Sequence, residues 1–285
     1  MAPDAVFLAG FNCDSEGGLD IRTGIDLYAV FGSPIVHSLS PRMHNYAFLQ
    51  HQPGSYYVPI ETEPQQLTHH LSAFREIGGR GANLTRPLKS TILPFLVAQS
   101  DTAQRAMAAN TIVWTPEGWV GDNTDVFALA SYIPEARHSR ALVIGNGGAA
   151  RASWVALLDR GYEVHVMARD PKRVWPEAIG LGWNPSRLRE AYSVIVNATP
   201  LGQTGEPGWD LAGLPNLTSP TIVVDWVYSP RLTPFLQWAR IQPGTTIVDG
   251  LSLLVAQARG AWNLWFGKPA PSGVLEVAIA WQPLS

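Results

Sequence analysis

Cysteine and lysine are scarce in this sequence of 285 residues, which contains one cysteine, Cys13, and three lysines. A single cysteine excludes an internal disulfide framework and a thiolate metal cluster, and it predicts a protein of the reducing cytoplasm. No apolar run reaches the roughly 18 residues that cross a bilayer, and Asp4 stands where a signal peptide would carry positive charge. We therefore expect a cytoplasmic protein that has neither a membrane partner nor a leader.

Concentrated positive charge is also absent, since the formal net charge is -3 and the arginines are scattered along the chain. We expect no nucleic-acid partner, because such partners are bound by surfaces that gather basic residues. The histidines show no metal-ligand spacing, so no metal site is predicted. A chain of this length with 46% hydrophobic residues predicts two domains, preceded by an extension over residues 1–26. It is compatible with a monomer or a homodimer.

The scarcity of lysine makes Lys89 informative, because it ends the polar segment GANLTRPLK at residues 81–89. A chain that uses arginine for nearly all its positive charges has little general need for ammonium groups. An arginine stays protonated over the accessible pH range, whereas a partly desolvated lysine exchanges its proton and serves as an acid or base. Lys89 is therefore a candidate catalytic residue, and the alternative is an ordinary surface lysine.

The first half of the chain alternates between strand and helix patterns. Residues 27–31 are apolar and end at a Gly-Ser-Pro turn, as a buried strand does, and residues 55–60 form a second predicted strand. Helical patterns follow at residues 41–49, 65–77 and 90–98. Asn83, Thr85 and Lys89 are expected on the connection that leaves a strand, where open α/β sheets bind ligands.

Two serines precede the first predicted helix. Ser40 is placed to cap that helix, with Pro41 at its first position. Capping does not account for the second hydroxyl, at Ser38, which is available to a ligand. An anion bound there would also be stabilised by the N-terminus of the helix.

A glycine-rich turn, GNGGAA at residues 145–150, directly follows the apolar residues 141–144. Gly145 permits a tight turn, Gly147 lets the backbone approach a pyrophosphate, and Ala150 allows close packing of the following helix. Gly148 and Ala149 complete the loop. A helix to about residue 158 and a strand at residues 162–167 make a βαβ unit, which favours dinucleotide binding over a purely structural turn.

The choice of cofactor depends on the residues just after the second strand of that unit. An acid there usually binds the ribose hydroxyls of NAD, whereas arginine binds the 2′-phosphate of NADP. Arg169 comes first, and Lys172 and Arg173 can approach a phosphate from the other side. NADP is therefore favoured. Asp170 is the opposing observation, so NAD stays possible.

Together, these motifs resemble those of the shikimate dehydrogenase family. In the first half they are GSPIVHSLSP at residues 32–41, NLTRPLK at 83–89, AANT at 108–111 and GDNTD at 121–125. The second half adds the glycine loop, NATPLG at residues 197–202, DWVYSP at 225–230 and a glutamine in the last helical segment. The resemblance runs in order from about Leu27 to the C-terminus.

The resemblance implies a role for each matching residue. Lys89 and Asp125 would form the catalytic pair, in which the ammonium stabilises and protonates the oxygen that becomes negative during reduction. The alternative role for Asp125 is helix capping. The substrate would be held by Ser38 and Ser40 at its carboxylate, and elsewhere by Thr85, Asn110, Asp125, Tyr228 and Gln257. The cofactor would be held by Gly145, Gly147, Gly148, Ala149, Arg169, Lys172, Arg173, Asn197, Thr199 and Gly250.

The expected fold is α/β with two domains. A substrate-binding catalytic domain is predicted over residues 1–124 and a Rossmann-type NAD(P)-binding domain over residues 125–250. A C-terminal helical segment, residues 251–285, is expected to pack back on the first domain. The predicted function is the reversible NADP-dependent reduction of 3-dehydroshikimate to shikimate in aromatic amino-acid biosynthesis. Alternatives are a quinate/shikimate or aminoshikimate dehydrogenase, and a nucleotide-sensing homologue without catalysis.

Overall fold

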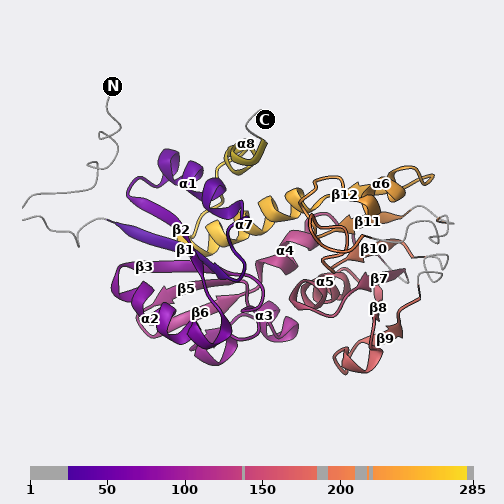
Figure 1. Cartoon of the computed structure of the whole chain (residues 1–285), viewed down its shortest axis with the longest axis horizontal. Helices are drawn as coiled ribbons and strands as arrows, with labels where there is room; N and C mark the ends of the chain where they lie inside the picture. Colours follow the sequence, from indigo (N-terminus) through magenta and orange to yellow (C-terminus); the bar gives the residue numbers. More distant parts are fainter. Residues whose placement is uncertain (1–24, 137–138, 185–191, 209–216, 218–220, 281–285) are drawn as a thin grey trace, which may run out of the picture. The chain divides into compact units, whose positions relative to one another are not determined.

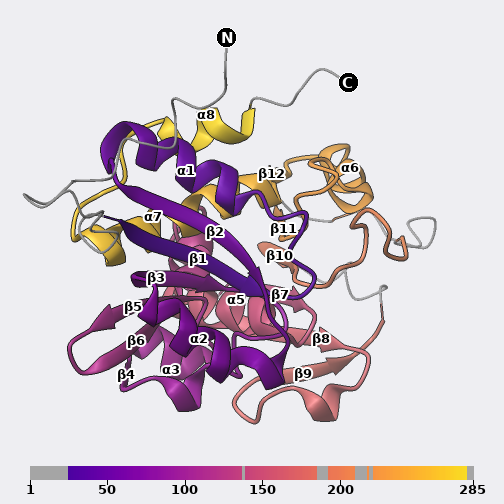
Figure 2. The same cartoon turned by 60° about the vertical axis from the view of Figure 1, so that its left-hand side comes forward.

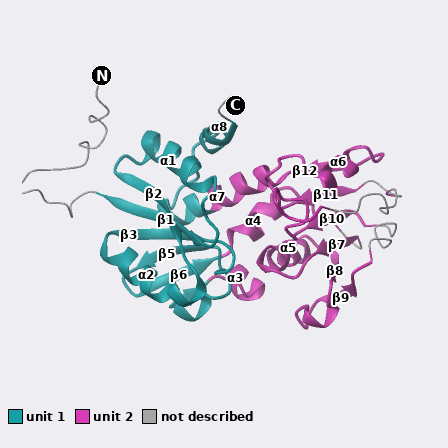
Figure 3. Ribbon diagram, in the orientation of Figure 1, with its two compact units in different colours: residues 1–99, 109–122, 261–285 teal, residues 100–108, 123–260 magenta. Residues whose placement is uncertain are grey.

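The computed structural model describes residues 25–136, 139–184, 192–208, 217 and 221–280. The chain divides into two compact units, which have separate colours in Figure 3. Unit 1 comprises Met1–Gln99, Ala109–Asp122 and Ala261–Ser285, and unit 2 comprises Ser100–Ala108 and Asn123–Gly260. The predicted α/β class is confirmed, and Ala261–Ser285 of the C-terminal segment belongs to unit 1. The domain boundaries at residues 124 and 250 stay predictions.

Unit 1 is built on a mixed sheet of six strands in the order β2-β1-β3-β5-β6-β4. The strands are β1 (Asp26–Gly32), β2 (Ser55–Glu61), β3 (Gly79–Leu84), β4 (Ala98–Gln99), β5 (Thr111–Thr115) and β6 (Gly118–Asp122). β1, β2 and β3 are parallel, and Figure 2 shows them side by side. β5 is antiparallel to both of its neighbours. The start of β5 therefore lies at the same sheet edge as the ends of β1, β3 and β6.

Helices cover both faces of the unit 1 sheet. The chain moves one way along the sheet from β1 to β2 and the other way from β2 to β3, so right-handed crossovers place their helices on opposite faces. These helices are α1 (Ser40–His51) and α2 (Leu67–Glu76), the latter preceded by a 3₁₀ turn, η2 (Pro64–Gln66). α8 (Val274–Ala280) lies beside α1 in Figures 1 and 2.

The core of unit 1 is rich in aromatic rings. Phe31 and Phe74 pack edge to face with 5.4 Å between ring centroids, and Tyr28 lies 4.8 Å from Trp265. Trp265 belongs to α7 (Gly250–Phe266), and its indole Nε1 donates a hydrogen bond to the Ile112 carbonyl of β5 at 3.0 Å. The last turns of α7 are thereby fixed to the sheet of unit 1.

Unit 2 contains a parallel sheet of six strands in the order β12-β11-β10-β7-β8-β9. The strands are β7 (Arg140–Ile144), β8 (Glu163–Ala168), β9 (Ile179–Gly182), β10 (Val194–Asn197), β11 (Ile222–Asp225) and β12 (Thr246–Val248). The helices are α3 (Asp101–Ala106), α4 (Thr124–Ala130), α5 (Gly148–Asp159), η4 (Pro171–Arg173) and α6 (Pro234–Arg240). The chain builds the sheet outward from β7 through β8 to β9, and then outward in the opposite direction from β10 to β12. Ligands of open α/β sheets bind at the carboxyl ends of the two strands where this direction changes, here β7 and β10.

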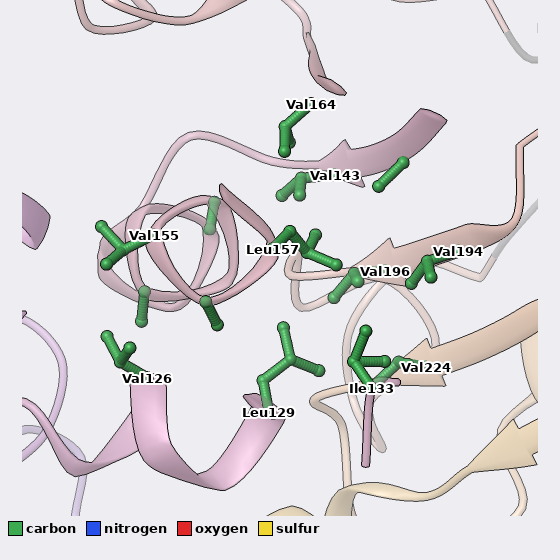
Figure 4. Packing of buried hydrophobic residues seen from close by; sticks show 14 of the residues in the cluster. Val126, Leu129, Ile133, Val143, Val155, Leu157, Val164, Val194, Val196 and Val224 are labelled. Atoms are coloured by element: carbon green, nitrogen blue, oxygen red, sulfur yellow. The ribbon is translucent and has the colours of Figure 1, made fainter. Parts of the chain in front are cut away.

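Aliphatic side chains fill the core of unit 2. Figure 4 shows Val143 and Val196 of the sheet packed with Val155 and Leu157 of α5 and with Leu129 of α4. Strands buried on both faces are rich in β-branched residues, and this explains the unbroken apolar runs in β7 and β10. The predicted βαβ unit around the glycine loop is confirmed as β7, α5 and β8.

The helix predicted over residues 90–98 is wrong. That segment contains only a single 3₁₀ turn, η3 (Leu93–Phe95), and then β4. Pro94 lies within the turn, lacks an amide hydrogen and cannot continue an α-helix. None of the described helices combines the length and apolarity needed to span a bilayer.

Candidate active site

Ser38, and not Ser40, provides the hydroxyl at the start of α1, so the predicted capping role of Ser40 is wrong. The helix has Leu39 at its N-cap position and Ser40 inside its first turn. Ser38 Oγ accepts a hydrogen bond from the Ser40 amide at 3.3 Å, while its own amide donates to the Ile35 carbonyl at 3.0 Å. Ser40 is buried, whereas Ser38 is partly exposed. The two predicted carboxylate ligands thus occupy different environments.

The loop after β1 and the loop after β3 are bonded to each other. The Ser33 amide donates to the Arg86 carbonyl at 3.0 Å, and the Thr85 amide donates to the Phe31 carbonyl at 2.9 Å. Gly32 is required at this contact, because a Cβ there would collide with the Thr85 methyl group and the Arg86 carbonyl. Asn83, predicted on the connection, lies within β3, while Thr85 follows the strand as expected.

Lys89 and Asn110 are brought together within unit 1. The Ala109 amide donates to the Lys89 carbonyl at 2.7 Å, which joins the end of the Lys89 loop to the residue before Asn110. Asn110 is fixed by two further backbone bonds, from the Leu84 amide to its carbonyl at 2.8 Å and from its amide to the Asp122 carbonyl at 3.1 Å. Its side chain is only 2% exposed, and Lys89 is partly exposed. Lys89 and Asn110, which are far apart in the sequence, therefore lie near each other where β3 ends and β5 begins.

Asp125 lies in the first turn of α4 in unit 2, with 3% of its surface exposed. The helix has Asn123 at its N-cap position without a side-chain capping bond, and Asn123 Nδ2 donates to the Ala108 carbonyl at 2.7 Å. Asp125 is inside the helix and does not occupy the capping position.

A buried carboxylate that the sequence analysis did not single out, Asp225, organises the ends of β10 and β11. It accepts hydrogen bonds from Asn197 Nδ2 at 2.9 Å, the Val227 amide at 3.0 Å and the Thr233 hydroxyl at 2.6 Å. Burial raises its pKa to about 6, although all three donors act in the opposite direction. Asp225 could have been found from the sequence, because it is the first residue of the motif DWVYSP at residues 225–230.

The Asp225 bonds fix two predicted site loops. In one loop, Asp225 accepts from the amide of Val227, the residue before Tyr228. Burial raises the pKa of the Tyr228 phenol, so its hydroxyl stays protonated. In the other loop, the amide and hydroxyl of Thr199 donate to Asn197 Oδ1 at 3.1 and 2.7 Å. The Asn197 and Thr199 side chains thus bond to each other and shape the loop.

The glycine loop has the geometry of a phosphate site. Gly145 adopts φ +119°, and its amide donates to the Met167 carbonyl at 2.9 Å. Gly147 is the N-cap residue of α5, and a Cβ at that position would meet no atom within 4 Å. The first amides of α5, including those of Gly148 and Ala149, have no acceptor within the helix and lie at a helix N-terminus, where anions are stabilised. This arrangement fits the pyrophosphate of a dinucleotide.

The basic residues after β8 are exposed, and Asp170 has a structural task among them. Asp170 is the N-cap of η4, and its carboxylate accepts a hydrogen bond from the Lys172 amide at 3.0 Å. Arg169, Lys172 and Arg173 surround this turn with exposed side chains. The carboxylate that opposed NADP in the sequence analysis is thus bonded to the backbone.

The start of α7 carries the remaining predicted residues. Gly250 is packed so closely that a Cβ would collide with the Val227 and Trp226 carbonyls. Gln257 is buried, and its Nε2 donates to the Leu254 carbonyl at 3.0 Å, which leaves its carbonyl oxygen and second N–H for other partners.

Known proteins are similar to this chain in sequence and in architecture. Residues 30–112 match the family model of the shikimate dehydrogenase substrate binding domain. A shikimate dehydrogenase (NADP(+)) of Thermosynechococcus vestitus is 37% identical over 89% of this chain and 94% of its own length. The chain belongs to the shikimate dehydrogenase family.

Solved structures of shikimate dehydrogenase relatives align over most of their length. The Thermus thermophilus shikimate 5-dehydrogenase in complex with NADP(H) and shikimate is 35% identical, with a TM-score of 0.77, covering 90% of this chain and 99% of that one. A quinate dehydrogenase from Corynebacterium glutamicum in complex with NAD is 28% identical, with a TM-score of 0.78 and coverage of 90% and 99%. Both alignments extend across both units.

Proposed function

We propose that this protein is a shikimate dehydrogenase that catalyses the reversible, NADP-dependent reduction of 3-dehydroshikimate to shikimate. The observation that carries the proposal is the bond between the Lys89 loop and the residue before Asn110, which sets an ammonium group and a buried amide at one sheet edge. An ammonium group and an amide can both form hydrogen bonds with the oxygen atoms of a small, hydroxylated acid. The family relatives named for shikimate and NADP support the same choice.

In this proposal unit 1 recognises the substrate. Ser38, at the start of α1, donates its hydroxyl hydrogen to the substrate carboxylate, and Ser40 lies behind it in the first helical turn. Thr85 and Asn110 contact the ring oxygens. Asp125, Tyr228 and Gln257 are the other residues proposed to bind the substrate.

Lys89 and Asp125 perform the proton chemistry. The hydride comes from the reduced nicotinamide of the cofactor. As the ketone oxygen gains negative charge, the Lys89 ammonium stabilises it and donates a proton; in the reverse direction the neutral amine accepts that proton. The Asp125 carboxylate accepts a hydrogen bond from the reacting hydroxyl and so orients it. A guanidinium such as Arg86 could not replace Lys89, because it does not release its proton.

NADP is held by unit 2. The amides of Gly148 and Ala149 bind the pyrophosphate, and Gly145 and Gly147 leave room for it. Arg169, Lys172 and Arg173 bind the 2′-phosphate, and Asp170 caps the turn η4 that contains Lys172 and Arg173. Asn197, Thr199 and Gly250 shape the loops around the cofactor. A cytoplasmic location and a monomeric or homodimeric state belong to the same proposal.

The test is a steady-state assay of the purified protein with shikimate or quinate and with each oxidised cofactor, followed by the absorbance of reduced nicotinamide. The proposal expects the highest kcat/KM with shikimate and NADP. Cofactor binding without turnover of either substrate would instead identify a nucleotide-sensing homologue.

Quinate/shikimate dehydrogenase activity is the second candidate, favoured by the likeness to the quinate dehydrogenase structure. Quinate has an additional hydroxyl on the carbon that bears the carboxylate, and a smaller residue at Ser40 would make room for it. Ser40 and Thr85 favour shikimate. Turnover of quinate with NAD at least equal to that of shikimate with NADP would select this candidate.

A further inference from the structure

Tyr57 in unit 1 is held on three sides. Its amide donates to Asn45 Oδ1 and its carbonyl accepts from Asn45 Nδ2, both at 2.8 Å. Its ring stacks on His44, with 4.5 Å between centroids and 14° between planes. His44 is fully buried, and burial lowers its pKa to about 3, so the stacked imidazole is neutral. Two consecutive residues of α1 therefore fix both the backbone and the ring of Tyr57.

The Tyr57 hydroxyl is a permanent hydrogen-bond donor. It donates to Asn83 Oδ1 at 2.8 Å, and Tyr57 is only 1% exposed. Burial raises the pKa of this phenol well above its ordinary value, while the Ser40 hydroxyl beside it acts in the opposite direction. The Asn110 carbonyl can only accept, so Asn83 Nδ2 faces that carbonyl and Asn83 Oδ1 faces the Tyr57 hydroxyl, which donates to it.

The orientation of Asn83 then determines that of Thr111. Both hydrogens of Asn83 Nδ2 point away from Tyr57, toward Thr111 Oγ1 at 3.0 Å and the Asn110 carbonyl at 3.3 Å. Thr111 Oγ1 accepts one of them, so its own hydrogen is directed elsewhere. It is donated to Asn110 Oδ1 at 3.1 Å.

We propose that Tyr57 is a positioning residue that acts through Asn83 and Thr111 to fix the side-chain amide of Asn110 with its oxygen toward Thr111. The Asn110 NH₂ group is then presented on the other side, as a donor to an acceptor oxygen of the bound substrate. An amide rotated by 180° would present an acceptor there. This inference rests on the proposed function, since it assigns Asn110 to a ring oxygen of shikimate.

The test compares Tyr57→Phe with Tyr56→Phe, which changes the adjacent tyrosine, 46% exposed, on the opposite face of β2. Loss of the buried donor should raise the KM for shikimate about 10-fold, with a smaller change in kcat. The KM for NADP should stay within about 2-fold of the wild-type value. The Tyr56 variant should match the wild type in all three constants.

A second pair of variants tests the last bond of the array. Thr111→Val removes the donor to Asn110 at nearly constant volume and should raise the shikimate KM about 10-fold. Thr111→Ser keeps the hydroxyl and should restore most of the affinity. This pair also tests the proposal if the Tyr57 variant does not fold, because Tyr57 can act on Asn110 only through Thr111.

The two possible failures are distinguishable. A wild-type protein that does not turn over shikimate with NADP contradicts the proposed function itself. An active wild type whose shikimate KM is the same in Thr111→Val and Thr111→Ser, or in Tyr57→Phe and Tyr56→Phe, contradicts the positioning role alone.

Discussion

The two units bury their polar side chains in different ways. In unit 1 the buried array of Tyr57, Asn83, Thr111 and Asn110 contains only groups that are neutral, and each hydrogen has one acceptor. In unit 2 the corresponding centre is a carboxylate, Asp225, surrounded by three donors. The neutral array fixes direction without depending on pH. The charged centre draws two loops together, but its burial connects the stability of unit 2 to pH.

This contrast matches a division of tasks. A substrate that exposes several hydroxyls is recognised by donors and acceptors of fixed direction, which a neutral array provides. A cofactor rich in phosphate needs loops of fixed backbone, and a buried anion that binds several donors provides those.

The largest expected effect is on kcat, from a change in unit 1 that should leave cofactor binding by unit 2 unaltered. Lys89→Met should lower kcat by about 10²- to 10⁴-fold, because a positioned acid and base is lost, while the affinity for NADP changes little. The control is Lys268→Met, which changes an exposed lysine and should leave kcat unaltered. Turnover by the Lys89 variant at the wild-type rate would remove this residue from the mechanism.

Asp225 should give unit 2 a pH-dependent stability. Its pKa is raised from 3.8 to about 6, so its contribution is fully present below pH 3.8 and is lost as the pH rises through 6. The advantage of the wild type over Asp225→Asn should therefore fall by about 3 kcal/mol between these limits. Urea unfolding at several pH values measures it, and a difference that is constant with pH would contradict the assignment.

Arg169 should govern cofactor choice without affecting the substrate. Arg169→Ser should raise the KM for NADP by about 10- to 50-fold, because a charged bond to the 2′-phosphate is lost, and should leave the KM for NAD unchanged. Arg240→Ser, at the exposed end of α6, is the matched control. An equal loss for both cofactors would show that Arg169 does not bind the 2′-phosphate.

The smallest expected effect concerns Asp170. Asp170→Asn keeps a side chain that caps η4 well but removes a negative charge near the 2′-phosphate site. The KM for NADP should fall by about 2- to 5-fold, with thermal stability preserved. A rise in the KM for NAD alone would mean that Asp170 binds the ribose of that cofactor.

Local sequence patterns predicted the elements whose structure is decided locally. The strand at residues 27–31 and the βαβ unit around Gly145 follow from apolar runs and glycine positions, and both are present. Residues 90–98 failed because their apolar spacing was given more weight than Pro94.

Side-chain partners far apart in the chain could not be predicted in this way. Tyr57 and Asn83 are separated by 26 positions, and Asn83 and Thr111 by 28, so neither pattern nor spacing marks them as partners. The start of α1 also differs from the prediction, because Leu39 and not Ser40 is its N-cap residue. Lys89, Ser38 and the glycine loop were marked by composition and local pattern, whereas residues such as Asn110 and Gln257 were marked only by the motif resemblance.

The most direct measurement of the central claim is a crystal structure of this protein with both shikimate and NADP bound. The account predicts that Lys89 Nζ and the Asp125 carboxylate each lie within hydrogen-bond distance of the hydroxyl whose carbon faces the nicotinamide. A complex in which neither group contacts that hydroxyl would contradict the account.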